Sequence, residues 1–437
     1  MSQTTAELLD EYGQYVVTSY GKPFPDILLV EGDGVFVKDS EGKQYLDFWA
    51  GVTVTVLGHG NPRVQQAVRD QMEKLVHCAS QSYYTMPPLK LAKALCQIAP
   101  ISPCKASFHT SGTEANDVAL KMAKRFTKRH EIIALQGSYH SWGYHAGVPG
   151  TPTAYYAHAA PALGPSVPGM YYAPPAYCYR CPFGLTYPAC DIACAKYLES
   201  IITHSTSRDV AAFIAEPIQG VGGIVTPPDD YFRRVQSILD KYGILLVLDE
   251  VQTRLGMTGK MWAAQTFGVQ PAIVTTAKAL GNGWPISAVL ARSDVADAFE
   301  PGDHYSTWGA HPVMCAAANA TVDYVLDNRL WENVQRMGQL LLNGLHELES
   351  KYEIIGEVRG KGLMIGVEIV EDRTSRAPGK KQAAQIRKLC ADRGLIIGSG
   401  GWWMNVLRIQ PPMTITEEHV MQALTTLEQA LEVASKS

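Results

Sequence analysis

The sequence predicts an α/β protein built around a mostly parallel β-sheet, with a smaller α+β unit near its C-terminal end. Short apolar runs recur between residues 106 and 292, and helical patterns such as 229–242 separate several of them. Near-continuous apolar strands that alternate with helices are typical of parallel sheets covered on both faces. Because ligands bind beyond the carboxyl ends of such strands, the residues that follow each apolar run are the candidates for a site.

In chain order, the N-terminal part is expected to form a helix, a loop and two short antiparallel strands at 34–38 and 45–48, joined by turn-forming Asp, Ser and Gly. Helices are expected at 61–76 and 87–98, where prolines stand near the first turn and a missing N–H costs least. The apolar runs predict buried strands at 131–135, 211–215, 244–248, 272–276 and 286–291.

The remaining elements follow from length and pattern. Residues 150–195 are rich in Pro, Tyr, Ala and Cys and are too long for an ordinary loop, so we expect an irregular surface excursion. A helix at about 330–350 leads out of the sheet region. The α+β unit after it is expected to contain strands at 353–358 and 363–369, a helix at 381–393, strands at 395–398 and 405–409, and a helix at 416–434.

These patterns divide the chain into two domains. Residues 60–326 form the predicted large domain, which holds the parallel sheet. The C-terminal small domain is expected at 327–437, and the N-terminal segment 1–59 is expected to join it.

Composition excludes several classes of protein. Of the 437 residues, 46% are hydrophobic and 18% are charged, which excludes a disordered or low-complexity chain. A net charge of −4 indicates neither a nucleic-acid binder nor a polybasic membrane protein. No apolar run approaches the roughly 18 residues of a membrane span, and the N-terminus lacks the pattern of a signal peptide. A cytoplasmic location is the resulting expectation.

Three groups of residues at predicted strand ends carry candidate chemistry. Residues 110–116 place hydroxyls and a glycine before an amphipathic helix, which is typical either of a phosphate site or of an ordinary helix cap. Asp249 ends an apolar run, where a carboxylate needs a partner such as a protonated pyridine nitrogen, unless it is a cap or an ion-paired acid. Lys278 follows a strand and precedes a glycine turn, so it is either a partly desolvated nucleophile or an exposed amine.

Considered together, the three groups match the requirements of one cofactor. Pyridoxal 5′-phosphate (PLP) needs a lysine for a Schiff base, an acid that keeps its ring nitrogen protonated, and an anchor for its phosphate. The sequence therefore predicts a PLP site at one edge of the sheet.

The chain also resembles the class III PLP-dependent aminotransferases of fold type I over nearly its whole length. The resemblance rests on the ordered motifs Leu57-Gly58-His59, Ser111-Gly112-Thr113-Glu114-Ala115-Asn116, Tyr139-His140, Glu216-Pro217-Ile218-Gln219-Gly220, Leu248-Asp249-Glu250-Val251-Gln252-Thr253, Lys278-Ala279-Leu280-Gly281-Asn282-Gly283, Val358-Arg359-Gly360-Lys361-Gly362-Leu363-Met364 and Arg408-Ile409-Gln410-Pro411-Pro412. The chain is most similar to the alanine–glyoxylate aminotransferase 2 and omega-amino-acid transaminase group, with the dialkylglycine decarboxylases nearby. This implies the aspartate-aminotransferase fold, with a mostly parallel seven-stranded sheet in the large domain.

The resemblance implies roles for individual residues. Lys278 would form the Schiff base and then move the α-proton, Asp249 would pair with the ring nitrogen, and Tyr139 would stack on the ring. Arg408 would bind the substrate α-carboxylate through its planar guanidinium. Glu216 is either the family's gating acid or a structural acid at a strand end. The other implied cofactor contacts are Ser111, Gly112, Thr113, His140, Val251, Gln252 and Thr307.

Thr307 is implied to reach the phosphate of a neighbouring subunit, so the resemblance implies a homodimer, with a tetramer also open. Two departures from the family pattern put the substrate in doubt rather than the cofactor. They are Arg254-Leu255-Gly256-Met257-Thr258-Gly259 in place of Gly-x-Gly-Arg-Thr-Gly, and Thr307-Trp308-Gly309-Ala310-His311-Pro312 in place of Thr-Phe-Gly-Gly-Asn-Pro.

The candidate substrate pocket is mainly aromatic, although aromatic side chains more often belong to a core. Its candidate residues are Trp49, Val52, Tyr83, Tyr84, Trp142, Trp402 and Trp403. The decarboxylase relatives have Gln in the region of Gly51-Val52-Thr53 and Trp near Tyr139, whereas this chain has Val52 and Tyr139, which disfavours decarboxylation.

The expected reaction is ping-pong transamination, from an amino acid or amine to a 2-oxo acid such as pyruvate or glyoxylate. The same lysine and aspartate serve amino-acid racemases and epimerases, so racemisation is an alternative, and a non-catalytic protein of this fold is another. No Gly-x-Gly-x-x-Gly follows the first strand of a βαβ unit, which excludes a nicotinamide dehydrogenase.

The chain has nine cysteines, too few for a secreted disulfide scaffold of this length. Four of them gather in one segment, at Cys178, Cys181, Cys190 and Cys194. Their spacing matches no standard zinc or ferredoxin pattern. Free thiols, a labile disulfide and a metal centre are all open interpretations, and no metal ligand is assigned.

Overall fold

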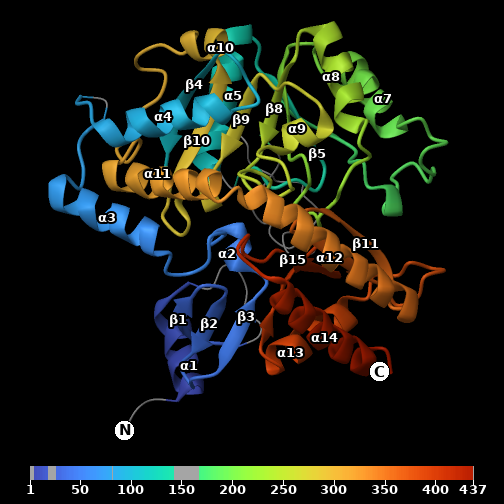
Figure 1. Ribbon diagram of the computed structural model, residues 1–437. Helices are drawn as coiled ribbons and strands as arrows, with labels where there is room; N and C mark the ends of the chain where they lie inside the picture. The colour runs from blue at the N-terminus through green and yellow to red at the C-terminus, as the bar shows by residue number, and fades with distance from the viewer. Residues whose placement is uncertain (1–3, 18–25, 81, 142–166, 437) are drawn as a thin grey trace.

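The computed structural model describes residues 4–17, 26–80, 82–141 and 167–436. Its main feature is a seven-stranded sheet of order β4-β10-β9-β8-β7-β5-β6, in the upper half of Figure 1. The strands are β4 (Cys104–His109), β5 (Glu131–Leu135), β6 (Met170–Ala173), β7 (Val210–Ala215), β8 (Leu245–Asp249), β9 (Ile273–Thr276) and β10 (Ser287–Arg292). Only β10 runs antiparallel to its neighbours, so the predicted mostly parallel seven-stranded sheet is confirmed.

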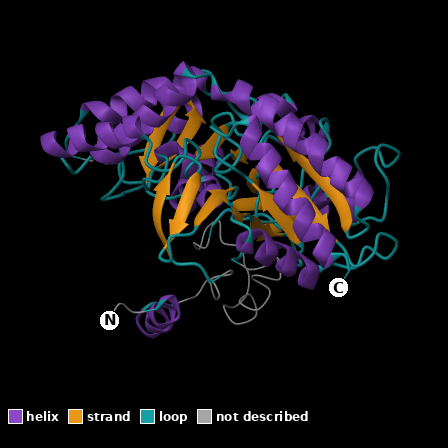
Figure 2. Ribbon diagram, turned by 60° about the horizontal axis from the view of Figure 1, so that its bottom comes forward, coloured by secondary structure: helices purple, strands orange, loops and turns teal. Residues whose placement is uncertain are grey.

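Helices cover both faces of this sheet (Figure 2). Helix α5 (Gly112–Thr127) buries one continuous apolar stripe and, with α10 (Ser293–Asp297), packs into the core on one face. The opposite core includes α4 (Met86–Ile98), α7 (Ala193–Ser200), α8 (Tyr231–Tyr242) and α9 (Ala263–Phe267). Coverage of both faces explains why β5 and β7 are buried along their whole length and, apart from Glu131 at the start of β5, are apolar without alternation.

Strands β4 and β6 were absent from the sequence expectation. Residues 104–109 are half-exposed over most of their length and carry little apolar signal. Strand β6 lies inside the 150–195 segment, where only an irregular excursion was expected, so that expectation was wrong for this part. The strand pairs in parallel with β5, and a short helical turn, Cys178–Arg180, and α7 follow it. Residues 142–166 of the excursion lie outside the described part of the chain.

The lower half of Figure 1 contains two four-stranded sheets, one of order β1-β2-β3-β13 and one of order β11-β12-β15-β14. The strands are β1 (Leu29–Asp33), β2 (Phe36–Asp39), β3 (Gln44–Asp47), β11 (Ile355–Lys361), β12 (Met364–Ile369), β13 (Leu395–Ile396), β14 (Gly398–Gly400) and β15 (Val406–Ile409). The helices around them are α1 (Thr5–Tyr15), α2 (Ala50–Thr53), α13 (Lys380–Asp392) and α14 (Glu417–Ala434), while α3 (Pro62–Lys74) packs against the helix Pro312–Asp327.

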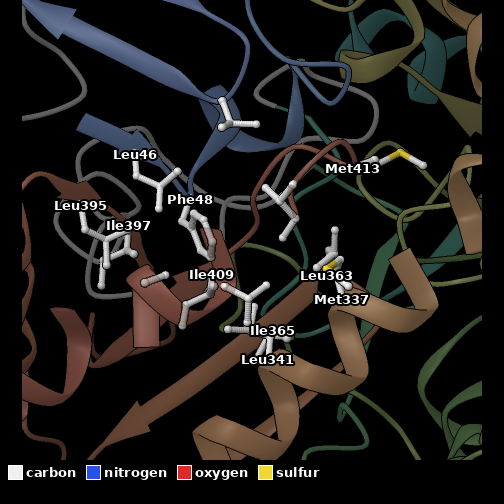
Figure 3. Packing of buried hydrophobic residues seen from close by; sticks show 14 of the residues in the cluster. Leu46, Phe48, Met337, Leu341, Leu363, Ile365, Leu395, Ile397, Ile409 and Met413 are labelled. Atoms are coloured by element: carbon white, nitrogen blue, oxygen red, sulfur yellow. The ribbon is translucent and has the colours of Figure 1, made fainter. Parts of the chain in front are cut away.

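Strand β13 pairs in parallel with β3, which places the N-terminal segment beside the C-terminal part of the chain. Figure 3 shows the shared core, in which Leu46 and Phe48 from the N-terminal side meet Leu395, Ile397 and Ile409. The two connecting helices, α11 (Pro312–Asp327) and α12 (Leu330–Lys351), contribute to the same core, as does α3. The domain limits at 59 and 326 stay a prediction.

Within the described residues, no helix has both the length and the apolar character that crossing a membrane requires.

Candidate functional site

A cavity of about 350 Å³ lies at the carboxyl edge of the seven-stranded sheet. Because β10 is antiparallel to both β4 and β9, the ends of the parallel strands and the start of β10 meet at this edge. The lining residues are Val54, Thr110, Ser111, Gly112, Thr113, Asn116, Tyr139, His140, Glu216, Asp249, Val251, Gln252, Ala277, Lys278, Gly283, Trp284, Pro285 and Ile286. The sheet therefore brings together residues that are far apart in sequence, and the volume suits a small ligand.

Asp249, at the end of β8, is almost fully buried, with 3% of its surface exposed. Its Oδ2 accepts hydrogen bonds from Asn116 Nδ2 at 2.8 Å and from the His140 ring at 2.8 Å, while Oδ1 accepts from the Val251 N–H at 3.0 Å. Asn116 is itself fixed by the Thr275 hydroxyl, which donates to its Oδ1 at 2.6 Å. These donors offset the cost of burying a carboxylate and hold it at the cavity wall.

Lys278 begins the turn that follows β9 and has a left-handed backbone, with φ of 48°. Burial lowers the pKa of its amine to about 7, with the positive charges of Arg254 and Arg408 adding to the effect. Asp249 and Glu216 oppose that shift. An amine with this pKa is partly neutral at pH 7, so it can act as a nucleophile or a proton acceptor.

The first turn of α5 forms another wall of the cavity. Ser111 caps the helix, since its hydroxyl accepts from the Glu114 N–H at 3.2 Å. The N–H groups of Gly112 and Thr113, which line the cavity, precede the first intrahelical hydrogen bonds. Free N–H groups and the positive end of the helix dipole favour an anion such as phosphate at this wall.

Glu216 follows β7 and is also buried. Its Oε1 accepts from the Tyr139 N–H and its Oε2 from the Gly220 N–H, both at 2.8 Å. Burial, together with the nearby charge of Asp249, raises the pKa of Glu216. Its two backbone contacts hold the Tyr139 and Gly220 segments against the cavity.

Gln252 connects the cavity to the C-terminal part of the chain. Its Oε1 accepts from Arg408 Nη2 at 2.8 Å. Its side chain also lies so close to Gly220 that a Cβ there would approach Gln252 Nε2 to 2.1 Å, so a larger residue would displace the Gln252 amide from this position. The Arg408 guanidinium lies 4.6 Å from the centre of the Trp49 ring, within cation–π range.

Several predicted residues lie elsewhere. Val52 has a φ of 67° and does not line the cavity, whereas Val54 does. Tyr83, with 68% of its surface exposed, and Tyr84 also lie outside it. Thr307 is exposed, and its carbonyl accepts from the His77 ring at 2.9 Å. Trp402, Trp403 and Trp49 are not cavity-lining, and Trp142 lies outside the described residues.

Some residues that shape the site have roles that their sequence motifs do not indicate. Asn116 appeared only as part of a motif, yet it joins Asp249 to Thr275. Arg254 was noted only as a departure from the family, yet it is buried and donates from Nη2 to the Thr53 carbonyl at 2.6 Å. Trp284, Pro285 and Ile286 line the cavity before β10, and only the apolar run beginning at Ile286 indicated this segment.

The cysteine segment lies apart from the cavity. Cys178, Cys181, Cys190 and Cys194 are all free thiols in the structure. Burial raises the pKa of Cys178 to about 11 and that of Cys194 to about 12, so both are protonated at neutral pH.

Comparisons with known proteins agree with this geometry. Residues 16–431 match the family described as Aminotransferase class-III. The leucine/methionine racemase of Thermococcus litoralis is 38% identical, with 97% of this chain and 95% of that protein covered. The acetylornithine aminotransferase of Methanopyrus kandleri is 37% identical, with 97% and 98% covered. A thermostable (S)-enantioselective omega-transaminase from Thermomicrobium roseum has a TM-score of 0.89 and 33% identity, with 99% and 100% covered.

The low pKa of Lys278 can be measured directly. Only a neutral amine reacts with an acylating reagent, so brief labelling of cofactor-free protein should reach half its maximum at Lys278 near pH 7. Lys351 is the internal control, because its hydrogen bond to Glu428 raises its pKa above the ordinary value of 10.5. Peptide mass spectrometry would follow both sites in one sample. If Lys278 became labelled only at the high pH at which Lys351 becomes labelled, the assignment of a lowered pKa to Lys278 would be contradicted.

Proposed function

The chain belongs to the class III aminotransferase family, and we propose which of its residues hold the family's cofactor and move the proton during amino transfer. It is a PLP-dependent enzyme that moves an amino group from an amino acid or amine to a 2-oxo acid. The observation that carries the residue assignment is the cavity, where a buried carboxylate, a lysine amine of lowered pKa and a helix N-terminus meet.

The residues present fit PLP. Asp249 would pair with the ring nitrogen, and the N–H groups of Gly112 and Thr113 would hold the phosphate. Tyr139 and Gln252 would contact the ring and its oxygen. The hydrogen bonds that Asp249 already accepts hold the carboxylate in its orientation before any ligand arrives. When bound, PLP supplies an electron-poor ring that absorbs the charge released at the substrate α-carbon.

Lys278 would act as the base that removes the α-proton and returns it at another carbon. General base catalysis is most efficient when the pKa of the base lies near the working pH, which the buried amine satisfies. Arg254 and Arg408 favour its neutral form through their charge, and Asp249 remains as the compensating anion.

Arg408 would bind the substrate α-carboxylate, since a guanidinium can offer two parallel N–H groups. Trp49 supports this arginine from one side, and Gly398 leaves room for the ring, because a Cβ at Gly398 would overlap Trp49. Small acceptors such as pyruvate or glyoxylate are proposed for the second half-reaction. Val52 and Tyr83 do not line the described cavity, so they would contact a substrate only where it extends beyond that cavity.

A second candidate function is amino-acid racemisation. Two curated relatives carry that activity in their names, the leucine/methionine racemase of Thermococcus litoralis and the alanine/serine racemase of Pyrococcus horikoshii. Both reactions begin with removal of the α-proton, so Lys278 and Asp249 would serve either one.

One assay distinguishes the two functions. The protein is given L-alanine or L-leucine, each deuterated at the α-carbon, together with pyruvate, glyoxylate or 2-oxoglutarate. Transamination predicts loss of deuterium with equal amounts of a new carbonyl product and a new amino acid. Racemisation predicts loss of deuterium with the D-amino acid and no amino transfer, which would contradict the proposed function.

Lys278→Ala should lower the rate of either reaction by at least about 10²–10⁴-fold, because it removes the base. Lys260→Ala, which changes an exposed lysine, is the matched control and should retain the parent rate. Turnover by Lys278→Ala at the parent rate would contradict the role given to Lys278.

We also propose a homodimer in which Thr307 of each subunit completes the cofactor site of the other. Thr307 is exposed and held in place by His77, while the neighbouring Tyr305 and Trp308 expose 65% and 58% of their surfaces. Exposed aromatic side chains that cluster in this way are typical of an interface.

Mixing two inactive variants tests this arrangement. Thr307→Glu places a negative charge against the phosphate, and Lys278→Ala removes the base, so each protein should be inactive alone. After subunit exchange, half of a statistical mixture is heterodimer with one intact site, so about one quarter of parent activity should return. Native mass spectrometry would verify the heterodimer. Heterodimer without activity, or an active Thr307→Glu protein, would contradict the shared site.

A further inference from the structure

A second group of chemically active side chains lies behind the α5 wall of the cavity. His109 ends β4, Glu114 lies in the first turn of α5, and His304 precedes the segment that carries Thr307. His109 Nδ1 and His304 Nε2 each lie 3.7 Å from the same Glu114 Oε1. These three atoms all lie within 4.8 Å of one another, and no other trio of His, Cys, Asp or Glu in the described residues is this compact.

The three groups do not satisfy one another. A separation of 3.7 Å is longer than a hydrogen bond. His109 Nδ1 and His304 Nε2 are buried and have no hydrogen-bond partner in the structure. His109 is also 95% buried, since only 5% of its surface is exposed. A buried polar atom without a partner is costly, so two of them around one carboxylate oxygen indicate a missing ligand.

The other polar atoms of the cluster are already held. Glu114 Oε2 accepts from the Thr110 N–H at 2.9 Å and from its hydroxyl at 2.8 Å. His109 Nε2 pairs with the Ser107 hydroxyl at 3.0 Å. Such outer contacts orient metal ligands and leave the opposite atom free to bind. Here they leave Glu114 Oε1 and His109 Nδ1, which lie 3.7 Å apart, for a shared ligand.

The donor types suit a cation. Imidazole nitrogens and carboxylate oxygens are ligands that divalent transition metals bind.

The spacing also suits a transition metal. Zinc binds imidazole nitrogen and carboxylate oxygen at about 2.0–2.2 Å in tetrahedral sites, which places neighbouring ligand atoms about 3.3–3.5 Å apart. The observed 3.7 Å would contract by a few tenths of an ångström on binding. His304 retains 17% side-chain exposure, which leaves a path for the ion to enter.

We propose that His109 Nδ1, Glu114 Oε1 and His304 Nε2 bind a divalent transition-metal ion, with Zn²⁺ as the preferred ion and water as a fourth ligand. The ion would tie the His304–Thr307 segment to the N-terminus of α5, whose Gly112 and Thr113 line the cavity. It is therefore a structural site that stiffens the phosphate end of the cavity, and it does not depend on the proposed reaction.

Zinc binding by the PLP-loaded protein tests this site. Protein without a histidine tag is treated with a chelator, and ZnCl₂ is then titrated in calorimetry, with zinc content measured after dialysis. The parent is expected to bind one more equivalent per chain than His109→Gln or His304→Gln. His346→Gln is the matched control, because exposed His346 also pairs with a glutamate, Glu349, on α12. It should bind as the parent does.

The proposal would be overturned if the parent bound no zinc. It would also be overturned if His109→Gln and His304→Gln each bound as much zinc as the parent. Cobalt spectroscopy of the parent provides an answer even if the variants fail to fold. Co²⁺ bound by two imidazoles and a carboxylate should give visible d–d bands without a thiolate charge-transfer band. Absence of these bands, or a thiolate band that shows binding to the cysteine segment alone, would overturn the assignment to His109, Glu114 and His304.

Discussion

The burial of the Asp249 carboxylate is the constraint on which the rest of the site depends. A carboxylate buried at the end of a central strand is costly without hydrogen-bond donors, and here Asn116, His140 and the Val251 N–H supply them. Each donor comes from a different segment, so satisfying this one group fixes α5, the residues after β5 and the turn after β8 around the cavity. The geometry of the cofactor site follows from that requirement.

Two buried arginines connect the N-terminal and C-terminal segments of the chain to the same cavity. Arg408 on β15 contacts Gln252, and Arg254 holds the Thr53 carbonyl of the N-terminal segment. Both arginines also lower the pKa of Lys278. The pairing of β3 with β13 and the core in Figure 3 keep these N- and C-terminal segments together. Packing far from the cavity thus determines where the proposed carboxylate-binding group lies and how basic the lysine is.

Much of the site could be predicted because it lies at strand ends, and buried strands carry a strong apolar signal. Asp249, Lys278, Glu216 and Gly112 were all placed at this edge from the sequence, and all line the cavity. Half-exposed β4 and β6 lack that signal. The cavity is lined by Val54 and not by the predicted Val52, because left-handed backbone at residues 50–53 turns the chain in a way that no local pattern reveals. Arg254 and Asn116 contact residues distant in sequence, so only the fold shows their roles.

The most direct test of this account is the rate of a single amino-transfer half-reaction in Asp249→Asn, with Asp240→Asn, an exposed change on α8, as its control. Asparagine keeps the shape of the side chain and removes its charge. The account predicts a loss of at least about 10²-fold for Asp249→Asn, with PLP still bound through its phosphate, and none for Asp240→Asn. An Asp249→Asn protein that reacts at the parent rate would contradict the central role of the buried carboxylate.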